Sequence, residues 1–96
     1  MGNVRAKILL PDAVAGLVRS MHPHLKKKMR SAFHILMKDP AAGKPLRDEL
    51  LGLRSFRVGR HRIIYRLRPR GQVEIVAVGS RESIYEETYR LLNKRD

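Results

Sequence analysis

The chain has 96 residues, of which 21 are lysine or arginine and only 9 are aspartate or glutamate. Its hydrophobic content of 43% excludes a disordered tail, and its length is expected to form one domain, residues 1–96. The formal net charge of +12 indicates an anionic partner, for which nucleic acid is the first candidate. A basic surface that is merely solvated is the competing interpretation.

Residue type and spacing exclude several kinds of site. The chain has no cysteine, which excludes disulfides and thiolate metal sites, and its four histidines lack partners at metal-site spacing. We therefore expect no metal and no cofactor. Pro11 and Asp12 interrupt the apolar residues 8–10, which argues against a signal peptide, and no apolar segment approaches membrane-spanning length. A cytoplasmic protein that binds no membrane is expected.

The first part of the chain predicts a short strand and two helices. Val4, Ala6 and Ile8 alternate with basic residues, which is typical of a strand with one buried face. A helix is expected after Pro11, and Pro23 is expected to end it before a second helix that runs to about residue 38. The apolar positions at helical spacing are Val14, Leu17, Val18 and Met21, then Leu25, Met29, Ala32, Phe33, Leu36 and Met37. Residues 40–52 predict a loop with one short helical turn.

The central part of the chain predicts a three-stranded antiparallel meander. Runs of β-branched or aromatic residues at 56–58, 62–67 and 73–78 are separated by turn signals at residues 59–60 and 69–71. Seven arginines and no acidic residue lie between Glu49 and Glu74. So many guanidinium groups on one small sheet favour contact with phosphate or with an acidic partner.

A last helix is expected to begin near Ser83, which has the spacing of a capping box with Glu86. Its apolar side would carry Ile84, Thr88, Leu91 and Leu92. The predicted order is β-α-α-β-β-β-α, and the predicted fold class is α+β. In this fold a small antiparallel sheet is packed by the N-terminal helical hairpin, with the last helix beside it.

Three arginines and a tyrosine are the candidate catalytic residues. Arg57, Arg62 and Arg81 are expected on or beside adjacent strands, and Tyr85 follows Arg81 by one helical turn. Arginine forks can hold phosphate oxygens and stabilise the charge of a pentavalent transition state, while a phenol can pass a proton or stack on a base. The pattern alone leaves open that these arginines contact only the acidic residues of a partner.

Residues 52–85 contain three further motifs: an arginine-bearing strand that ends in Val58-Gly59, the run His61-Arg62-Ile63-Ile64-Tyr65, and Gly79-Ser80-Arg81 followed by Tyr85. In these motifs and in the order of its elements, the chain resembles the RelE/ParE superfamily of type II toxins. The RelE branch implies a metal-independent endoribonuclease that cuts mRNA in the ribosomal A site. In that chemistry the ribose 2′-OH attacks the adjacent phosphate and leaves a 2′,3′-cyclic phosphate.

By resemblance, the RelE-branch residues are matched by Arg57, Arg62, Arg81 and Tyr85. Arg62 and Arg81 would stabilise the phosphate charge, and Tyr85 would orient the substrate or stack on a base. The sequence departs from the family where Ser55 replaces a lysine of some members, and again at Ser80, where many relatives have histidine or lysine. Because arginine effectively cannot lose its proton, an all-arginine site lacks an evident general base.

His61 is the nearby titratable residue, but strand alternation predicts that it points away from the face of Arg62. Two alternatives therefore stay open: a ParE-like inhibitor of DNA gyrase without nuclease activity, and a non-catalytic RNA-binding module. The retained arginines and tyrosine favour the RelE branch.

The resemblance also implies partners. An acidic antitoxin, partly disordered before binding, would match the charge of +12, and its candidate contacts are Ile84, Leu91 and Leu92. The ribosome and mRNA would be bound through phosphates. Their candidate contacts are Lys26, Lys27, Lys28, Arg30, Arg54 and Arg60, although a solvated face also explains the lysine run.

Overall fold

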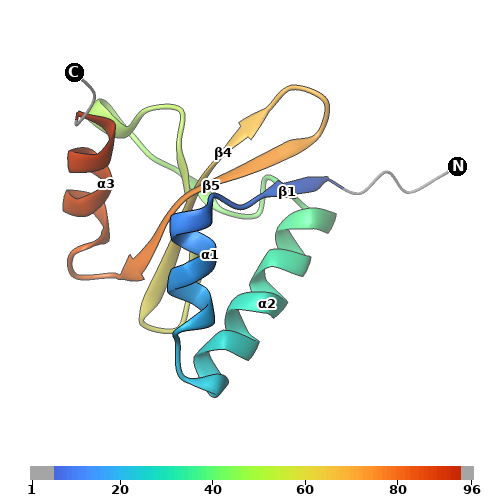
Figure 1. Cartoon of the computed structure of the whole chain (residues 1–96). Coiled ribbons are helices and arrows are strands. Elements are labelled where there is room, and N and C mark those ends of the chain that lie inside the picture. Colours follow the sequence, from blue (N-terminus) through green and yellow to red (C-terminus); the bar gives the residue numbers. More distant parts are fainter. Residues whose placement is uncertain (1–5, 94–96) are drawn as a thin grey trace, which may run out of the picture.

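The computed structural model describes residues 6–93 of the chain. Its elements are β1 (Lys7–Leu9), α1 (Asp12–Arg19), α2 (Pro23–Lys38), β2 (Lys44–Pro45), the short 3₁₀ helix η1 (Asp48–Leu50), β3 (Arg54–Val58), β4 (His61–Arg68), β5 (Gln72–Ser80) and α3 (Ile84–Leu92). The strands form one sheet in the order β1-β5-β4-β3-β2. Helices α1 and α2 lie side by side against this sheet, and α3 stands apart from them at the far end of β5 (Figure 1).

The α+β class and the predicted succession of elements are confirmed, but the sheet is mixed rather than antiparallel. Strand β1 runs parallel to β5, with Ile8 opposite Val73, and β2 pairs with β3 inside the segment expected to be a loop. Neither pairing leaves a local signal, because the partner of β1 is far along the chain and β2 has only two residues, one of them Pro45. The proposed strand residue Val4 lies outside the described residues.

Two apolar clusters cover the two faces of the sheet. Towards α1 and α2, helix residues such as Met29 and Leu36 pack against Ile63 and Tyr65. The second cluster lies towards α3, and its buried members are Leu53, Ile64, Ala77 and Ile84. Because side chains alternate along a strand, β4 supplies both clusters from neighbouring residues.

The predicted apolar faces of the helices are correct except at single positions. On α1, Val14 and Val18 are buried one turn apart, whereas Leu17 is 45% exposed because it lies about 100° around the helix from Val18. Helix α1 ends at Arg19, before Pro23. That proline instead opens α2, where its missing N–H has no intrahelical partner to lose.

The segment before β3 is fixed by one buried phenol and one guanidinium. The Tyr65 hydroxyl donates to the Pro40 carbonyl at 2.8 Å and accepts from the Gly43 N–H at 2.8 Å. Arg54 donates to the carbonyls of Gly43, at 3.1 Å, and Ala41, at 3.0 Å. These bonds satisfy the backbone of the loop and hold β2 at the edge of β3.

The start of α3 differs from the predicted capping box. Ser83 is the N-cap residue, but its hydroxyl donates to Glu87 at 3.2 Å instead of capping the helix, and Glu86 pairs with Arg90 at 3.2 Å. Ile84 is fully buried, whereas Leu91 is 52% exposed and does not belong to the buried side of the helix as predicted. None of the described helices is both long and apolar enough to cross a membrane.

Glu74 carries the one resolved pKa shift among the described residues. Arg66 donates a hydrogen bond to its carboxylate at 2.7 Å, and Arg68 lies 3.5 Å away. The Arg66 hydrogen bond, followed by the charges of Arg66 and Arg68, holds the pKa of Glu74 below its usual 4.5 despite partial burial.

Replacing Glu74 by glutamine is expected to lower the free energy of unfolding by less than about 1 kcal/mol at pH 7, because the ion pair is partly exposed. The pKa is depressed in the folded state, so the contribution is present above pH 4.5 and is lost as the pH falls through the folded value. Urea unfolding of the wild type and Glu74→Gln between pH 7 and pH 3 measures this. A difference that does not shrink below pH 4.5 would contradict the assignment.

Candidate functional site

Arg57 and Arg62 lie directly opposite each other on β3 and β4. Their neighbours Val58 and Ile63 belong to the cluster under α1 and α2, so both arginines project from the face that α3 packs against. Like charges placed directly opposite each other across a strand pair destabilise the sheet. A bound anion would remove this repulsion.

The Arg62 guanidinium has no hydrogen-bond or ion-pair partner among residues 6–93. It is half-buried, its Nε is buried without a hydrogen bond, and no ion pair to it is found within residues 6–93. The described ion pairs instead use Arg66, Arg68 and Arg90. Leaving a buried donor without a partner costs about 1–3 kcal/mol of folding free energy, and more when the donor is charged. An acceptor from outside the chain would therefore bind favourably to Arg62.

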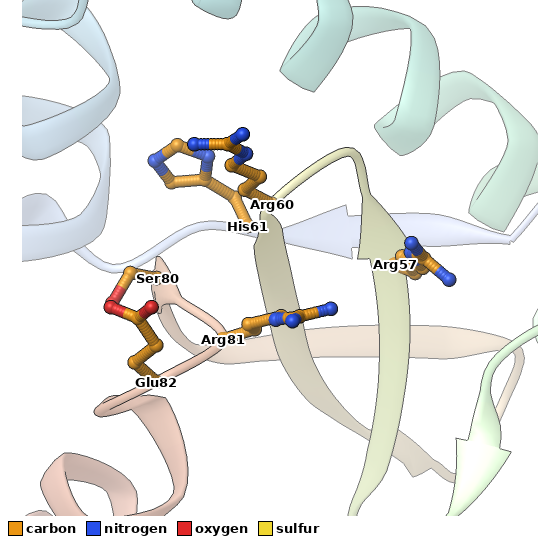
Figure 2. A pocket seen from close by; sticks show the side chains of 6 residues that line it. All are labelled: Arg57, Arg60, His61, Ser80, Arg81 and Glu82. Atoms are coloured by element: carbon orange, nitrogen blue, oxygen red, sulfur yellow. The ribbon is translucent and has the colours of Figure 1, made fainter.

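A cleft of about 570 Å³ opens beside this pair, at the end of the sheet where β3 turns into β4 and β5 runs into α3. Figure 2 shows Arg81 extending from the end of β5 across β4 towards Arg57. The backbone N–H of Arg81 donates to the Arg60 carbonyl at 2.9 Å, which fixes the start of this side chain. The lining residues are Arg57, Arg60, His61, Ser80, Arg81 and Glu82.

Tyr85 is placed by a residue of β3. Its hydroxyl lies 3.1 Å from the hydroxyl of Ser55, which is buried two positions before Arg57 on the same strand. Ser55 stands where the sequence departs from the lysine of some RelE members, and here it anchors the phenol. Tyr85 does not line the cleft itself, but it is partly exposed on the same face of the sheet.

Three residues that line the cleft, His61, Ser80 and Glu82, were not among the predicted site residues. Glu82 was interpreted only as part of the start of a helix, yet it is exposed in the cleft together with Arg81. His61 lines the cleft although strand alternation turns it from the face of Arg62, because it is the first residue of β4, beside the turn. Its position after Gly59, in a tight turn with positive φ, was the available signal.

The predicted RNA-binding residues fall into four groups. Arg60 lines the cleft, whereas Arg54 is bonded to loop carbonyls and its role here is structural. Lys27 and Lys28 line a separate groove between α2 and β3. The remaining two, Lys26 and Arg30, lie on α2 and line neither cavity.

The predicted antitoxin contacts on α3 are unequal in exposure. Ile84 is inaccessible and Leu92 is half-buried against the same cluster, so only Leu91 is free for contact while α3 stays on the sheet. Residues 6–93 also contain no group of three histidine, aspartate or glutamate side chains placed to hold a metal ion.

The arrangement can bind a phosphodiester. Three arginines line the cleft, and Arg62 lies opposite one of them, Arg57, without lining it. Their planar donors match phosphate oxygens, and fixed donors of this kind stabilise charge that develops during phosphoryl transfer. His61 and Glu82 are the titratable side chains at the cleft wall that could exchange a proton.

Known proteins share this fold. The family model for the ParE toxin of the parDE type II toxin-antitoxin system matches residues 15–85. A chain in the crystal structure of the toxin–antitoxin complex RelBE2 from Mycobacterium tuberculosis is 30% identical, with a TM-score of 0.73, and the match covers 81% of this chain and all 100% of that chain. No curated protein sequence matches the chain.

Two further structures share the fold at lower identity. A mutant of the E. coli toxin RelE in the free state is 13% identical, with a TM-score of 0.69, over 88% of this chain and 90% of that chain. A chain of the archaeal RelE–RelB complex from Pyrococcus horikoshii OT3 is 18% identical, with a TM-score of 0.66, over 80% of this chain and 96% of that chain. On the family match and the 30% identical relative, the chain belongs to the ParE toxin family of type II toxin–antitoxin systems, within the RelE/ParE superfamily.

Proposed function

We propose that this type II toxin is a ribosome-dependent mRNA endoribonuclease that cleaves by attack of a ribose 2′-OH on the adjacent phosphate. The observation that carries the proposal is the Arg57–Arg62 pair, two opposed guanidiniums with no acidic partner among the described residues, at the edge of an arginine-lined cleft. A phosphodiester would neutralise both charges and would accept from the unpaired Arg62 Nε, whereas the Arg57 Nε already donates to the Gly59 carbonyl at 3.3 Å.

The residues divide the chemical work as follows. Arg62 and Arg81 hold the non-bridging oxygens and stabilise the extra negative charge as the 2′ oxygen adds to phosphorus. Arg57 binds the same phosphate from the neighbouring strand. The Tyr85 hydroxyl is held by the Ser55 hydroxyl, and the ring of Tyr85 orients the nucleotide on the same face of the sheet. The 5′ oxygen of the next nucleotide then leaves, and a 2′,3′-cyclic phosphate remains.

Proton transfer falls to the non-arginine residues of the cleft. His61 and Glu82 both line it, and one of them accepts the 2′-OH proton. A water molecule protonates the leaving 5′ oxygen, and the hydroxide that it leaves takes up the proton held by the base. An imidazole and a carboxylate can each accept and return a proton, whereas a guanidinium effectively cannot lose one.

The proposed partners follow from charge and from the relatives. The relatives from M. tuberculosis and P. horikoshii were crystallised as complexes with an antitoxin or RelB. We propose an acidic antitoxin for this chain, and ribosomal RNA phosphates as the contacts of the basic residues on α2.

A cell-free cleavage assay tests the function. Wild-type protein is added to a defined mRNA with and without purified ribosomes, and cuts are mapped by primer extension. Cuts that require ribosomes are the expected result. Cuts of equal strength without ribosomes would show that the protein is a nuclease but that it does not need the ribosomal A site.

The second candidate is a ParE-like inhibitor of DNA gyrase. It is favoured by the family model that matches the chain, which is the ParE toxin model. The same protein preparation in a gyrase supercoiling assay separates the two candidates, because the nuclease proposal expects supercoiling to be unaffected. Loss of supercoiling without any mRNA cut would establish the ParE-like activity.

Replacing Tyr85 by phenylalanine is expected to slow cleavage by roughly 10–100-fold. The substitution keeps the ring but removes the hydroxyl, and a hydrogen bond to a charged group contributes about 1.5–3 kcal/mol. Single-turnover cleavage on programmed ribosomes measures the rate. The matched control is Tyr89→Phe, which removes a hydroxyl from the exposed side of the same helix. Equal effects of the two substitutions would contradict a role for the Tyr85 hydroxyl.

A further inference from the structure

A second cavity lies on the other side of Arg57 from the cleft. It is a groove of about 420 Å³ between α2 and β3, and Arg57 lines both it and the cleft. We call it the α2/β3 groove. Its floor is apolar and includes Ala32, Ile35, Phe56 and Val58. Ile35 is 46% exposed there, which leaves a large aliphatic surface without cover among the described residues.

The rim of the α2/β3 groove is basic. His24, Lys27 and Lys28 line it from α2, and Arg57 lines it from β3. No acidic side chain lines it, and no ion pair involving these residues is found in the described part of the chain. An apolar floor with a positive rim fits a ligand that has aliphatic groups between negative charges.

The groove also runs along an open sheet edge. Strand β2 reaches only as far as Lys44, opposite Ser55, so no described strand lies beside the rest of β3. The Leu53 carbonyl bonds to Leu46 on the β2 side, and by the two-residue period of a strand the N–H and C=O of Arg57 point the same way, outwards. An extended chain could therefore pair with β3 at Arg57.

From these three features we propose that the α2/β3 groove binds an extended acidic peptide segment of a partner protein, with aliphatic side chains on the groove floor and carboxylates on the basic rim. The inference rests on the proposed antitoxin partner and adds its docking surface. Nucleic acid is the weaker fit, because the floor is mainly aliphatic and offers little flat aromatic surface for stacking bases.

The shared residue gives the groove a consequence for activity. A carboxylate bound to Arg57 in the groove draws that guanidinium from the cleft and neutralises it. The partner segment would thus weaken phosphate binding from outside the cleft, while α3 remains packed on the sheet.

The test uses the whole chain, labelled with ¹⁵N, and the probe peptide acetyl-Glu-Val-Glu-Leu-Glu-Val-Glu-amide. We expect amide shift changes at residues 56–58 and 27–35, and slower hydrogen exchange of the Arg57 amide. A peptide with serine in place of valine and leucine should bind at least tenfold more weakly. A heptauridylate is titrated in parallel to probe nucleic acid at the same surface.

Matched variants locate the binding. Ile35→Asp should weaken peptide binding at least tenfold, whereas Leu17→Asp, at an equally exposed position on α1, should leave it unchanged. Lys27→Ala/Lys28→Ala should weaken it more than Arg30→Ala/Lys38→Ala, which removes the same charge from α2 outside the groove.

No peptide binding, peptide shifts confined to the cleft, equal effects of the paired variants, or groove shifts caused by heptauridylate alone would each overturn the proposal. None of these readouts needs nuclease activity, so failure of the groove and failure of the proposed cleavage are seen separately.

Discussion

Replacing Arg62 by alanine is expected to slow mRNA cleavage on the ribosome by about 10²–10³-fold, the usual effect of removing one preorganised donor to a transition-state charge. Its guanidinium is half-buried and has no partner within the described chain, so none of its binding capacity is used by the fold. The folded protein should not be destabilised, because the repulsion between Arg57 and Arg62 disappears with the side chain.

The control for this prediction is Arg68→Ala, which removes one charge from the same strand at an exposed position outside the cleft. Single-turnover rates on programmed ribosomes are compared with urea unfolding curves for both variants. Arg62→Lys keeps the charge but not the planar fork, and it should recover only part of the lost rate. If the Arg62→Ala protein cleaves as fast as the Arg68→Ala protein, Arg62 does not belong to the catalytic site.

Replacing Gly43 by alanine is expected to lower the free energy of unfolding by about 3 kcal/mol. A Cβ at this position would lie 2.6 Å from the Tyr65 hydroxyl oxygen, 2.8 Å from Cε1 of the same ring and 3.0 Å from the Ser55 carbonyl oxygen. Tyr65 is fully buried and cannot move aside, so the loop must open and break both hydrogen bonds of its hydroxyl. Thermal unfolding should then occur more than about 10 °C lower.

The same chemical change at Gly16 provides the control. Gly16 lies inside α1, and its new Cβ would find only the end of Arg19, 3.8 Å away. Because alanine favours the helix by about 0.5–1 kcal/mol over glycine, Gly16→Ala should stabilise the protein. Equal unfolding midpoints for the two variants would show that the contact between Gly43 and Tyr65 does not constrain the loop.

The elements that could be predicted are those with strong local patterns. The apolar periodicity of α2 and the turn signals at Gly59 and at residues 69–71 located the long helix and the meander correctly. Strand β1 was foreseen, but its parallel pairing with β5 is a contact between distant parts of the chain that no local pattern encodes. Strand β2 depends on Tyr65 and Arg54 bonding to the loop, which a reading of residues 40–52 alone could not anticipate.

The predicted proximity of two site residues is confirmed where strand register determines it. Arg57 and Arg62 fall opposite each other because a two-residue turn follows Val58, whereas the sequence predicted only that adjacent strands bring them within reach. The Ser55–Tyr85 contact joins β3 to α3, and it depends on how the helix packs. Glu82 and His61 enter the cleft through the path of the backbone at strand ends, where alternation no longer predicts direction. The roles assigned to these residues in cleavage remain predictions.

The most direct test of the central claim removes one oxygen atom, the attacking 2′ oxygen, from the substrate. An mRNA is prepared with a single 2′-deoxynucleotide on the 5′ side of the bond that wild-type protein cuts on the ribosome, and is compared with the all-ribose mRNA. We predict that the cut at this bond disappears, while the all-ribose mRNA yields a fragment ending in a 2′,3′-cyclic phosphate. Undiminished cutting at the deoxy position, or no cut in either mRNA, would contradict the account.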